Sequence, residues 1–270
     1  MTFLNIQKIE NERTRSIVNV VLFVAVCLLI QAVSTLLIAG FGHFILKIDF
    51  INFYAFTFVA YLFQLPVILF VTKKWNIDLR SDIKPINLKV VLILISVSIS
   101  IFLLYPIISE PIRYFTQLVN GQIVVFLPRR IDPGILTVLS LISYVVFAPV
   151  FEEIVFRKMI FNYLRRSFSI PIAIAISSIL FALVHMQFSG TGFMKLIYGV
   201  AFCIAYYKSK SIITPVVFHA IVNIIAQLTR QHVIDATAIN ISRYFPFLLL
   251  GILFLFFLIK GLYKQTKLIK

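Results

Sequence analysis

The sequence predicts an all-α polytopic membrane protein, a bundle of about eight transmembrane helices with both termini in the cytoplasm. The first observation is composition, since 61% of the 270 residues are hydrophobic and 28 residues are phenylalanine. A soluble domain of this length has no interior large enough for so much apolar surface. The second observation is that apolar runs recur at the length needed to cross a ~30 Å hydrocarbon core as helix. The third is that basic residues gather in alternate loops between these runs.

The apolar runs predict the individual elements. We expect spans at 17–39, 50–72, 90–109, 134–166, 169–187, 193–207, 212–228 and 244–260. The segment 110–133 is rich in proline and glycine, and we expect it to be a loop with a short interfacial helix. No repeat, low-complexity tract or soluble linker divides the chain, which predicts a single integral membrane domain over residues 1–270.

The charge pattern predicts topology and partners. Basic clusters precede the first expected span and follow the second, fourth, sixth and eighth, which places these clusters and both termini on the cytoplasmic side. The net charge of +15 is spread over these clusters, so it indicates anionic lipids and not nucleic acid. Cys27 and Cys203 both lie in apolar runs and indicate neither a disulfide framework nor a thiolate metal site.

Two adjacent acids stand inside the apolar stretch APVFEEIVFR, residues 148–157. An ionised carboxylate in hydrocarbon costs several kcal/mol unless it is paired, hydrated or protonated. Arg157 follows Glu153 by one helical turn, which predicts an ion pair and leaves Glu152, about 100° away on the helix, for another role. The alternative is that both acids are solvated at a helix end. We expect Pro149 to kink this helix and to free a carbonyl beside the acids.

Three more polar residues are predicted at a similar depth. At 1.5 Å per residue from the cytoplasmic edge, Glu152 lies about 20 Å deep, His185 about 25 Å, His219 about 14 Å and Asn223 about 20 Å. A carboxylate, two imidazoles and an amide in one layer can activate water and stabilise an oxyanion, or hold a metal with an open position. Simpler explanations are an interfacial His185, and a helix–helix hydrogen-bonding pair formed by His219 and Asn223.

These residues fall into three motifs that occur together in a known family. EEIVFR (152–157), FALVH (181–185) and HAIVN (219–223) resemble the EExxxR, FxxxH and HxxxN motifs of the CPBP intramembrane proteases. This family is also called Abi and is related to the type II CAAX prenyl endopeptidases. The resemblance covers about residues 134–228 and includes Pro215 just before the last motif, while Lys158 replaces the small residue that many members carry there.

The resemblance implies a role for each motif residue. Glu152 would activate the attacking water, with His185 assisting. His219 and Asn223 would stabilise the oxyanion. The site would be supported by Glu153, Arg157 and Phe181.

The resemblance leaves a glutamic and a metallo mechanism open. A divalent metal such as zinc would take Glu152, His185 and His219 as ligands. The chain has no HExxH, and the residues favour water activation without an obligatory metal.

The implied activity is that of an intramembrane endopeptidase acting on a membrane-anchored or apolar peptide. Its task would be CAAX-type processing of a prenylated protein, or bacteriocin or signal-peptide maturation and self-immunity. The composition, rich in Ile, Phe, Lys and Asn, favours a bacterial cytoplasmic membrane. One alternative is a non-catalytic immunity or scaffold protein of the same fold, which loss of a motif residue would have favoured. A less favoured alternative is a proton-coupled transporter, which inverted repeats would have supported.

Overall fold

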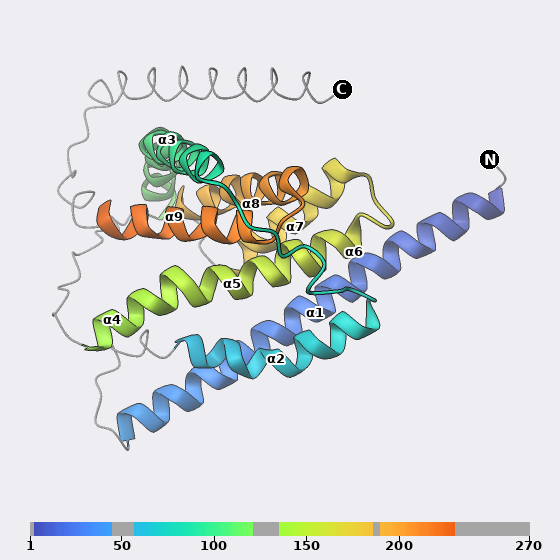
Figure 1. Ribbon diagram of the computed structural model, residues 1–270, viewed down its shortest axis with the longest axis horizontal. Helices are drawn as coiled ribbons and strands as arrows, with labels where there is room; N and C mark the ends of the chain where they lie inside the picture. Colours follow the sequence, from blue (N-terminus) through green and yellow to red (C-terminus); the bar gives the residue numbers. More distant parts are fainter. Residues whose placement is uncertain (1–2, 45–56, 121–134, 186–189, 230–270) are drawn as a thin grey trace.

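The computed structural model describes residues 3–44, 57–120, 135–185 and 190–229, and within these ranges every regular element is a helix (Figure 1). The α-helices are α1 (Phe3–Phe44), α2 (Thr57–Lys74), α3 (Leu88–Asn120), α4 (Ile135–Ile142), α5 (Ala148–Glu153), α6 (Asn162–Leu164), α7 (Ile170–Val184), α8 (Gly190–Ser209) and α9 (Ile213–Thr229). Two π-helical segments, η2 (Ser143–Phe147) and η3 (Ile154–Phe161), lie between them.

The prediction of a helical integral membrane protein is confirmed at this level. The segments Lys8–Phe44, Leu88–Tyr105 and Thr137–Leu164 are long and apolar enough to cross a membrane. The helices Ile170–Val184 and Ile213–Leu228 are apolar but shorter. The expected eighth span, 244–260, lies outside the described residues, so the number of spans and the location of the termini stay predictions.

The expected fourth span is one continuous rod assembled from α4, η2, α5, η3 and α6 (Figure 1). The backbone N–H of Ala148 bonds to the carbonyl of Ser143, five residues back, so the helix is already in π register when it reaches Pro149. Pro149 has no N–H to continue the ladder. Short π segments inside α-helices are rare and occur frequently at functional sites.

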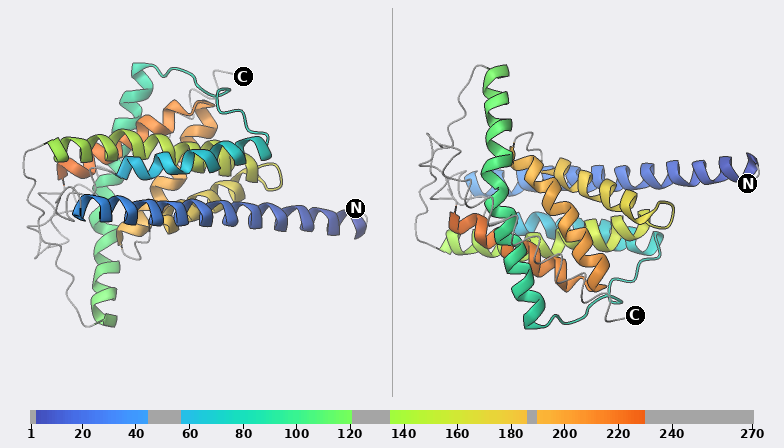
Figure 2. Two further views of the ribbon diagram at one scale, coloured as in Figure 1. Left: turned by 90° about the horizontal axis from the view of Figure 1, so that it is seen from below. Right: turned by 90° about the horizontal axis from the view of Figure 1, so that it is seen from above.

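The helices do not all run in one direction. Helices α1 and α2 and the α4–α6 rod lie roughly along a common direction, whereas α3 crosses them steeply (Figures 1 and 2). Helix α3 packs on α8 and α9. A single membrane normal therefore cannot run along both α1 and α3.

Helix α3 also corrects the prediction for 110–133. The helix continues through Pro106 and Pro111 to Asn120, so the prediction of a loop is wrong for residues 110–120, and residues 121–133 lie outside the described ranges. Each proline removes one backbone hydrogen bond. A helix in a membrane protein tolerates this loss where neighbouring groups or local adjustments satisfy the freed carbonyls. The proline spacing alone could not show this.

Several basic segments that were predicted to share one side of the membrane meet at one end of the molecule. Arg13 of α1 donates through Nε to the carbonyl of Ser167 at 3.2 Å, just beyond α6. Arg166 donates through Nη1 to the carbonyl of Trp75 at 2.6 Å, at the start of the loop after α2. These contacts agree with a common side, while the assignment of that side to the cytoplasm stays a prediction.

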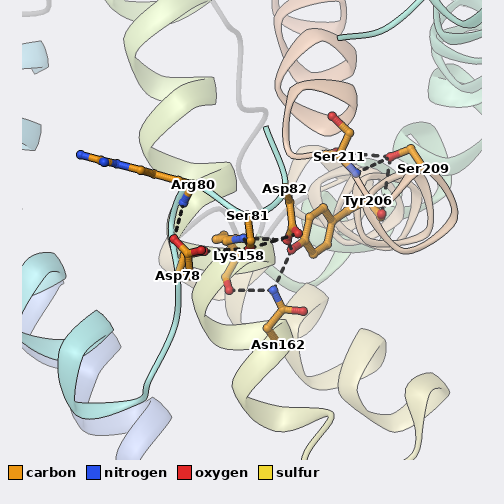
Figure 3. Close-up of polar contacts among 9 residues, drawn as sticks. All are labelled: Asp78, Arg80, Ser81, Asp82, Lys158, Asn162, Tyr206, Ser209 and Ser211. Atoms are coloured by element: carbon orange, nitrogen blue, oxygen red, sulfur yellow. Dashed lines mark hydrogen bonds and ion pairs between the residues drawn. The ribbon is translucent and has the colours of Figure 1, made fainter. Parts of the chain in front are cut away.

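The loop between α2 and α3 is tied to the rod by an ion pair between a partly exposed aspartate and a buried lysine (Figure 3). Oδ2 of Asp82 lies 2.7 Å from Nζ of Lys158 on η3 and accepts a hydrogen bond from the Tyr206 hydroxyl of α8 at 2.5 Å. Burial alone would raise the pKa of the Asp82 carboxyl. The hydrogen bonds from Lys158 and Tyr206 outweigh burial and hold that pKa below its ordinary value. Lys158 thus has a structural partner outside the motif segment.

The apolar core is centred on the second half of the rod. Met159, Ile160, Phe161 and Leu164 are fully buried. They belong to one cluster with buried residues of α1, α2, α7, α8 and α9. Packing on all sides fixes η3 and α6, and the motif residues lie on or beside this fixed part of the rod.

Candidate active site

Glu153, at the end of α5, lies between two basic partners. Its Oε1 is 2.9 Å from Nδ1 of His219 on α9, and its Oε2 is 3.0 Å from Nε of Arg157. The second contact is an ion pair without hydrogen-bond geometry, because neither Oε2 nor Nε has a hydrogen-bond partner among the described residues. Glu153 and Arg157 both have 0% side-chain exposure, so Glu153 is not a solvated acid at a helix end.

Arg157 is enclosed by aromatic rings from two helices. Its guanidinium carbon is 4.3 Å from the ring centre of Phe181 on α7 and 5.2 Å from that of Phe202 on α8. Its Nη2 donates to the carbonyl of Gly199 at 3.2 Å. The π faces and the carbonyl offset part of the cost of burying the cation. Phe181, from the FxxxH motif, therefore covers the ion pair.

Gly199 allows α8 to approach α7 closely at this point. A Cβ added to Gly199 would lie 3.1 Å from Cβ and 3.2 Å from Cα of Ser178. A larger residue would push the two helices apart and move the Gly199 carbonyl away from Arg157. The absence of a side chain at this position thus belongs to the architecture of the ion pair.

Glu152 faces a different set of partners from its neighbour. The Tyr61 hydroxyl of α2 donates to its Oε1 at 3.0 Å. Its Oε2 lies 3.7 Å from Nε2 of His185 and 4.0 Å from Nε2 of His219. Oε2 is buried and has no hydrogen-bond partner among the described residues. The structure therefore brings together the three ionisable motif residues that the depth argument placed in one layer.

The Nδ1 atoms of His185 and His219 determine whether the Nε2 atoms donate or accept a hydrogen bond on the side of Glu152. Nδ1 of His185 is 2.6 Å from the carbonyl of Phe181, and a carbonyl only accepts, so this nitrogen carries a proton. Nδ1 of His219 faces the Glu153 carboxylate in the same way. In the neutral rings, both Nε2 atoms then carry lone pairs toward Oε2 of Glu152. Acceptors arranged in this way suit a water molecule or a cation between them.

Asn223 makes its contact with the rod and not with the acids. Its Nδ2 donates to the carbonyl of Tyr144 in η2 at 2.8 Å. In π register this carbonyl would receive the N–H of Pro149, which does not exist. The carbonyl that Pro149 was expected to free is thus bonded to Asn223 of the HxxxN motif. This contact joins α9 to the rod, in agreement with the simpler explanation that Asn223 forms a hydrogen bond between helices.

Two residues near Glu152 were not predicted from the sequence. Tyr61 lies on α2, and Lys195 of α8 contributes a positive charge that acts on Glu152, His185 and His219. Lys195 did carry a signal, because a charged residue inside an expected span is a functional candidate by default. Tyr61 carried almost none, since tyrosines are common in apolar helices.

A metal fits these residues poorly. Glu152, His185 and His219 are the ligands that a metal would take, but among the described residues no group of three His, Cys, Asp or Glu side chains is arranged to hold one. The Lys195 charge acts on all three and would oppose a divalent cation in a medium of low dielectric constant. The donor chemistry of the site is better suited to a bound water.

Comparison with known proteins agrees with the motifs. Residues 134–225 match the sequence model of the family described as type II CAAX prenyl endopeptidase Rce1-like. The membrane-embedded CAAX protease MroQ of Staphylococcus aureus (strain USA300) is 35% identical over 86 residues, which cover 29% of this chain and 34% of the relative. The match thus spans about a third of that relative's length. No solved structure is significantly similar. The matched segment contains all three motifs in order, so this third of the chain is similar to the CAAX protease-like membrane proteins of the CPBP family.

Proposed function

We propose that the protein is an intramembrane endopeptidase in which Glu152 activates the water that attacks a peptide bond. The observation that carries the proposal is the buried Oε2 of Glu152, which lacks a hydrogen-bond partner among the described residues and faces Nε2 of His185 and of His219. A carboxylate oxygen with two neighbouring imidazoles is a site for general-base catalysis. The similarity of residues 134–225 to the CAAX endopeptidase family supports a peptide as the substrate.

The geometry supports a simple sequence of bond changes. A water between Oε2 of Glu152 and Nε2 of His185 gives one proton to Glu152 as its oxygen bonds to the scissile carbonyl carbon. His185 orients the water by accepting its second hydrogen. The protonated Glu152 then gives its proton to the leaving nitrogen as the C–N bond breaks, which restores the carboxylate. General acid–base catalysis of this kind contributes about 10²–10⁴-fold to a rate.

The oxyanion would be stabilised from α8 and α9. One N–H of the Asn223 amide donates to the carbonyl of Tyr144, which leaves the second N–H for a developing oxyanion. His219 lies against the same space, and because its Nδ1–H faces Glu153, it would donate to the oxyanion through Nε2 in its protonated form. Lys195 adds a positive charge there. Donors aimed at an oxyanion are worth roughly 2.7–4 kcal/mol each.

We propose an apolar or lipid-anchored peptide as the substrate class, since Glu152 lies within the Thr137–Leu164 segment that is apolar enough to cross a membrane. A prenylated C-terminus and a bacteriocin or signal peptide both belong to this class. The enzyme would reside in a bacterial cytoplasmic membrane as a multi-pass protein, with its basic end toward the cytoplasm and anionic lipids around it.

The test compares the intact protein with Glu152→Gln and with Glu12→Gln, a matched acid-to-amide change at an exposed position of α1. Peptides recovered from membranes of cells producing each protein would identify cleavage products that depend on Glu152. The purified proteins in liposomes would then receive a peptide spanning that cut, and a CAAX peptide with and without its farnesyl group. Cleavage by the intact protein and by Glu12→Gln, but not by Glu152→Gln, is expected. Cleavage that persists in Glu152→Gln would refute the proposal.

A further inference from the structure

We propose that Tyr61 is a positioning residue for Glu152, whose hydroxyl holds one carboxylate oxygen and leaves the other to accept the proton from water. The inference rests on the proposed function and deepens it. It also assigns part of the site to α2, which lies outside the segment 134–225 that matches the family.

The position of the phenol is fixed by aromatic stacking between α2 and the rod. The ring of Tyr61 stacks on Phe151, with centroids 5.3 Å apart and planes at 22°. One turn earlier on α2, Phe58 stacks on Phe147 with centroids 5.2 Å apart and planes at 28°. Two parallel ring pairs therefore set the register of α2 against the rod. The stacked rings thus fix the position of the Tyr61 hydroxyl beside Glu152.

The hydrogen bond makes the two oxygens of Glu152 inequivalent. Oε1 accepts the phenol proton at 3.0 Å, whereas Oε2 has no hydrogen-bond partner among the described residues. An oxygen that already accepts a hydrogen bond is the weaker base, so Oε2 is the better acceptor of a proton from water. The terminal torsion of a glutamate is broad and roughly two-fold, so a carboxylate without this bond can rotate and exchange its oxygens.

This role predicts a particular kinetic effect. The hydroxyl contacts the carboxylate and not the substrate, so its loss should lower kcat and leave KM nearly unchanged. A purely structural role would instead lower the melting temperature and the yield, and the folded fraction would keep its kcat. The two roles are therefore separable by measurement.

The variant that isolates the hydroxyl is Tyr61→Phe, because the ring that stacks on Phe151 remains. A matched control is Tyr207→Phe, since Tyr207 lies edge-on to Phe161 and is about 18 Å along α8 from Lys195. We expect kcat of Tyr61→Phe to fall about 10–100-fold with KM within about twofold, and the control to match the intact protein. Tyr207→Phe should melt at the temperature of the intact protein in the same detergent, and the kinetics of Tyr61→Phe are measured at a temperature at which that variant is fully folded.

An infrared measurement tests the hydrogen bond without a substrate. The difference spectrum between a protein and its Glu152→Gln variant isolates the carboxylate stretching bands of Glu152. These bands should shift in the Tyr61→Phe background and stay in place in the Tyr207→Phe background. Unshifted bands together with an undiminished kcat in Tyr61→Phe would overturn the assignment.

The outcomes separate this inference from the proposed function. If the intact protein cleaves peptide, Glu152→Gln does not, and Tyr61→Phe keeps its full kcat, the assignment of Tyr61 fails and the proposed function stands. If the intact protein cleaves nothing, or Glu152→Gln cleaves as well as the intact protein, the proposed function fails and the positioning role falls with it.

Discussion

The side-chain amide of Asn223 donates a hydrogen bond to the backbone carbonyl of Tyr144 at 2.8 Å, five residues before Pro149. The bond joins the HxxxN motif on α9 to the rod where the helix changes to π register. A helix-interior proline removes a backbone donor, and here a side chain from another helix supplies one. Helix α9, which carries the HxxxN motif, therefore contacts the rod, which carries the EExxxR motif, at two points. One is the hydrogen bond from Asn223 to the backbone carbonyl, and the other is the contact between His219 and Glu153.

Asn223→Ala should therefore lower both stability and turnover. Losing a donor to a buried carbonyl costs about 1–3 kcal/mol of stability, and losing an oxyanion donor lowers kcat about 10²–10³-fold. Melting in detergent and steady-state kinetics measure the two effects. Asn19→Ala is the matched control, because Asn19 donates to the Tyr163 hydroxyl between α1 and α6 and should affect stability alone. An unchanged melting temperature in Asn223→Ala would contradict the structural half of this prediction.

Glu153→Gln should act on stability more than on chemistry. The substitution leaves the guanidinium of Arg157 buried without its counter-charge, and removing one partner of a buried pair costs roughly 3–5 kcal/mol. Yield and melting temperature should fall. The double variant Glu153→Gln/Arg157→Met should recover part of the loss, because no charge is then left unpaired. A stable, inactive Glu153→Gln beside an active Glu152→Gln would mean that the two acids have the opposite roles.

Gly199→Ala should destabilise the protein even though it adds a single methyl group. The new Cβ would meet Ser178 at 3.1 Å and Phe181 at 3.3 Å, and overpacking of this kind costs about 1–3 kcal/mol. Gly40→Ala is the control, since Gly40 lies within α1 and has nothing within 4 Å of an added Cβ. Replacing a helical glycine in open space should be neutral or stabilising by up to about 1 kcal/mol. Equal melting temperatures for the two variants would refute the close approach of α7 and α8.

The sequence was sufficient for those parts of the site that helical periodicity determines. The Glu153–Arg157 pair follows from a spacing of four, and the common layer of Glu152, His185 and His219 follows from counting residues along three helices. Periodicity says nothing about which helices are neighbours. The contact between Tyr61 and Glu152 joins residues 91 positions apart and exists only because α2 stacks on the rod.

The backbone register of the rod was equally inaccessible from the sequence. Pro149 indicated a break in the hydrogen-bond ladder, but a kink and a π segment are both possible responses to a proline. Contacts with other parts of the chain accompany the π register here. The carbonyl of Phe156 in η3, for example, accepts the Ser177 hydroxyl of α7 at 2.9 Å. Such contacts depend on the tertiary arrangement.

Asp82 predicts a pH dependence at the loop after α2. Its folded-state pKa lies below the ordinary value of about 3.9, so its contribution to stability is present above that value and is lost as the pH falls through the folded pKa. The intact protein should melt above Asp82→Asn at pH 7, and the difference should shrink below about pH 4. Asp78→Asn is the control, because the only contact described for the Asp78 carboxylate is a local backbone N–H from Arg80. A difference that is constant with pH would exclude an ionic origin.

The remaining question about the chemistry is whether a metal is needed, and the charges around Glu152 favour a reaction without one. Two carboxylates, Glu152 and Glu153, are already balanced by Arg157 and Lys195 when both histidines are neutral. A divalent cation would add two uncompensated charges to a buried site, at a cost of several kcal/mol.

Purified protein should therefore contain less than one equivalent of zinc, and peptide cleavage should survive exhaustive chelation. Elemental analysis run beside activity measurements checks both expectations, and His219→Ala distinguishes the two mechanisms. Without a metal, His219→Ala removes the imidazole that faces the oxyanion and also removes the Nδ1–H that contacts the Glu153 carboxylate. The value of kcat should then fall by about 10²-fold or more, while the metal content stays unchanged. With a metal ligated by His219, the same substitution would release it. One equivalent of zinc that follows activity through purification and disappears in His219→Ala would establish a metalloprotease instead.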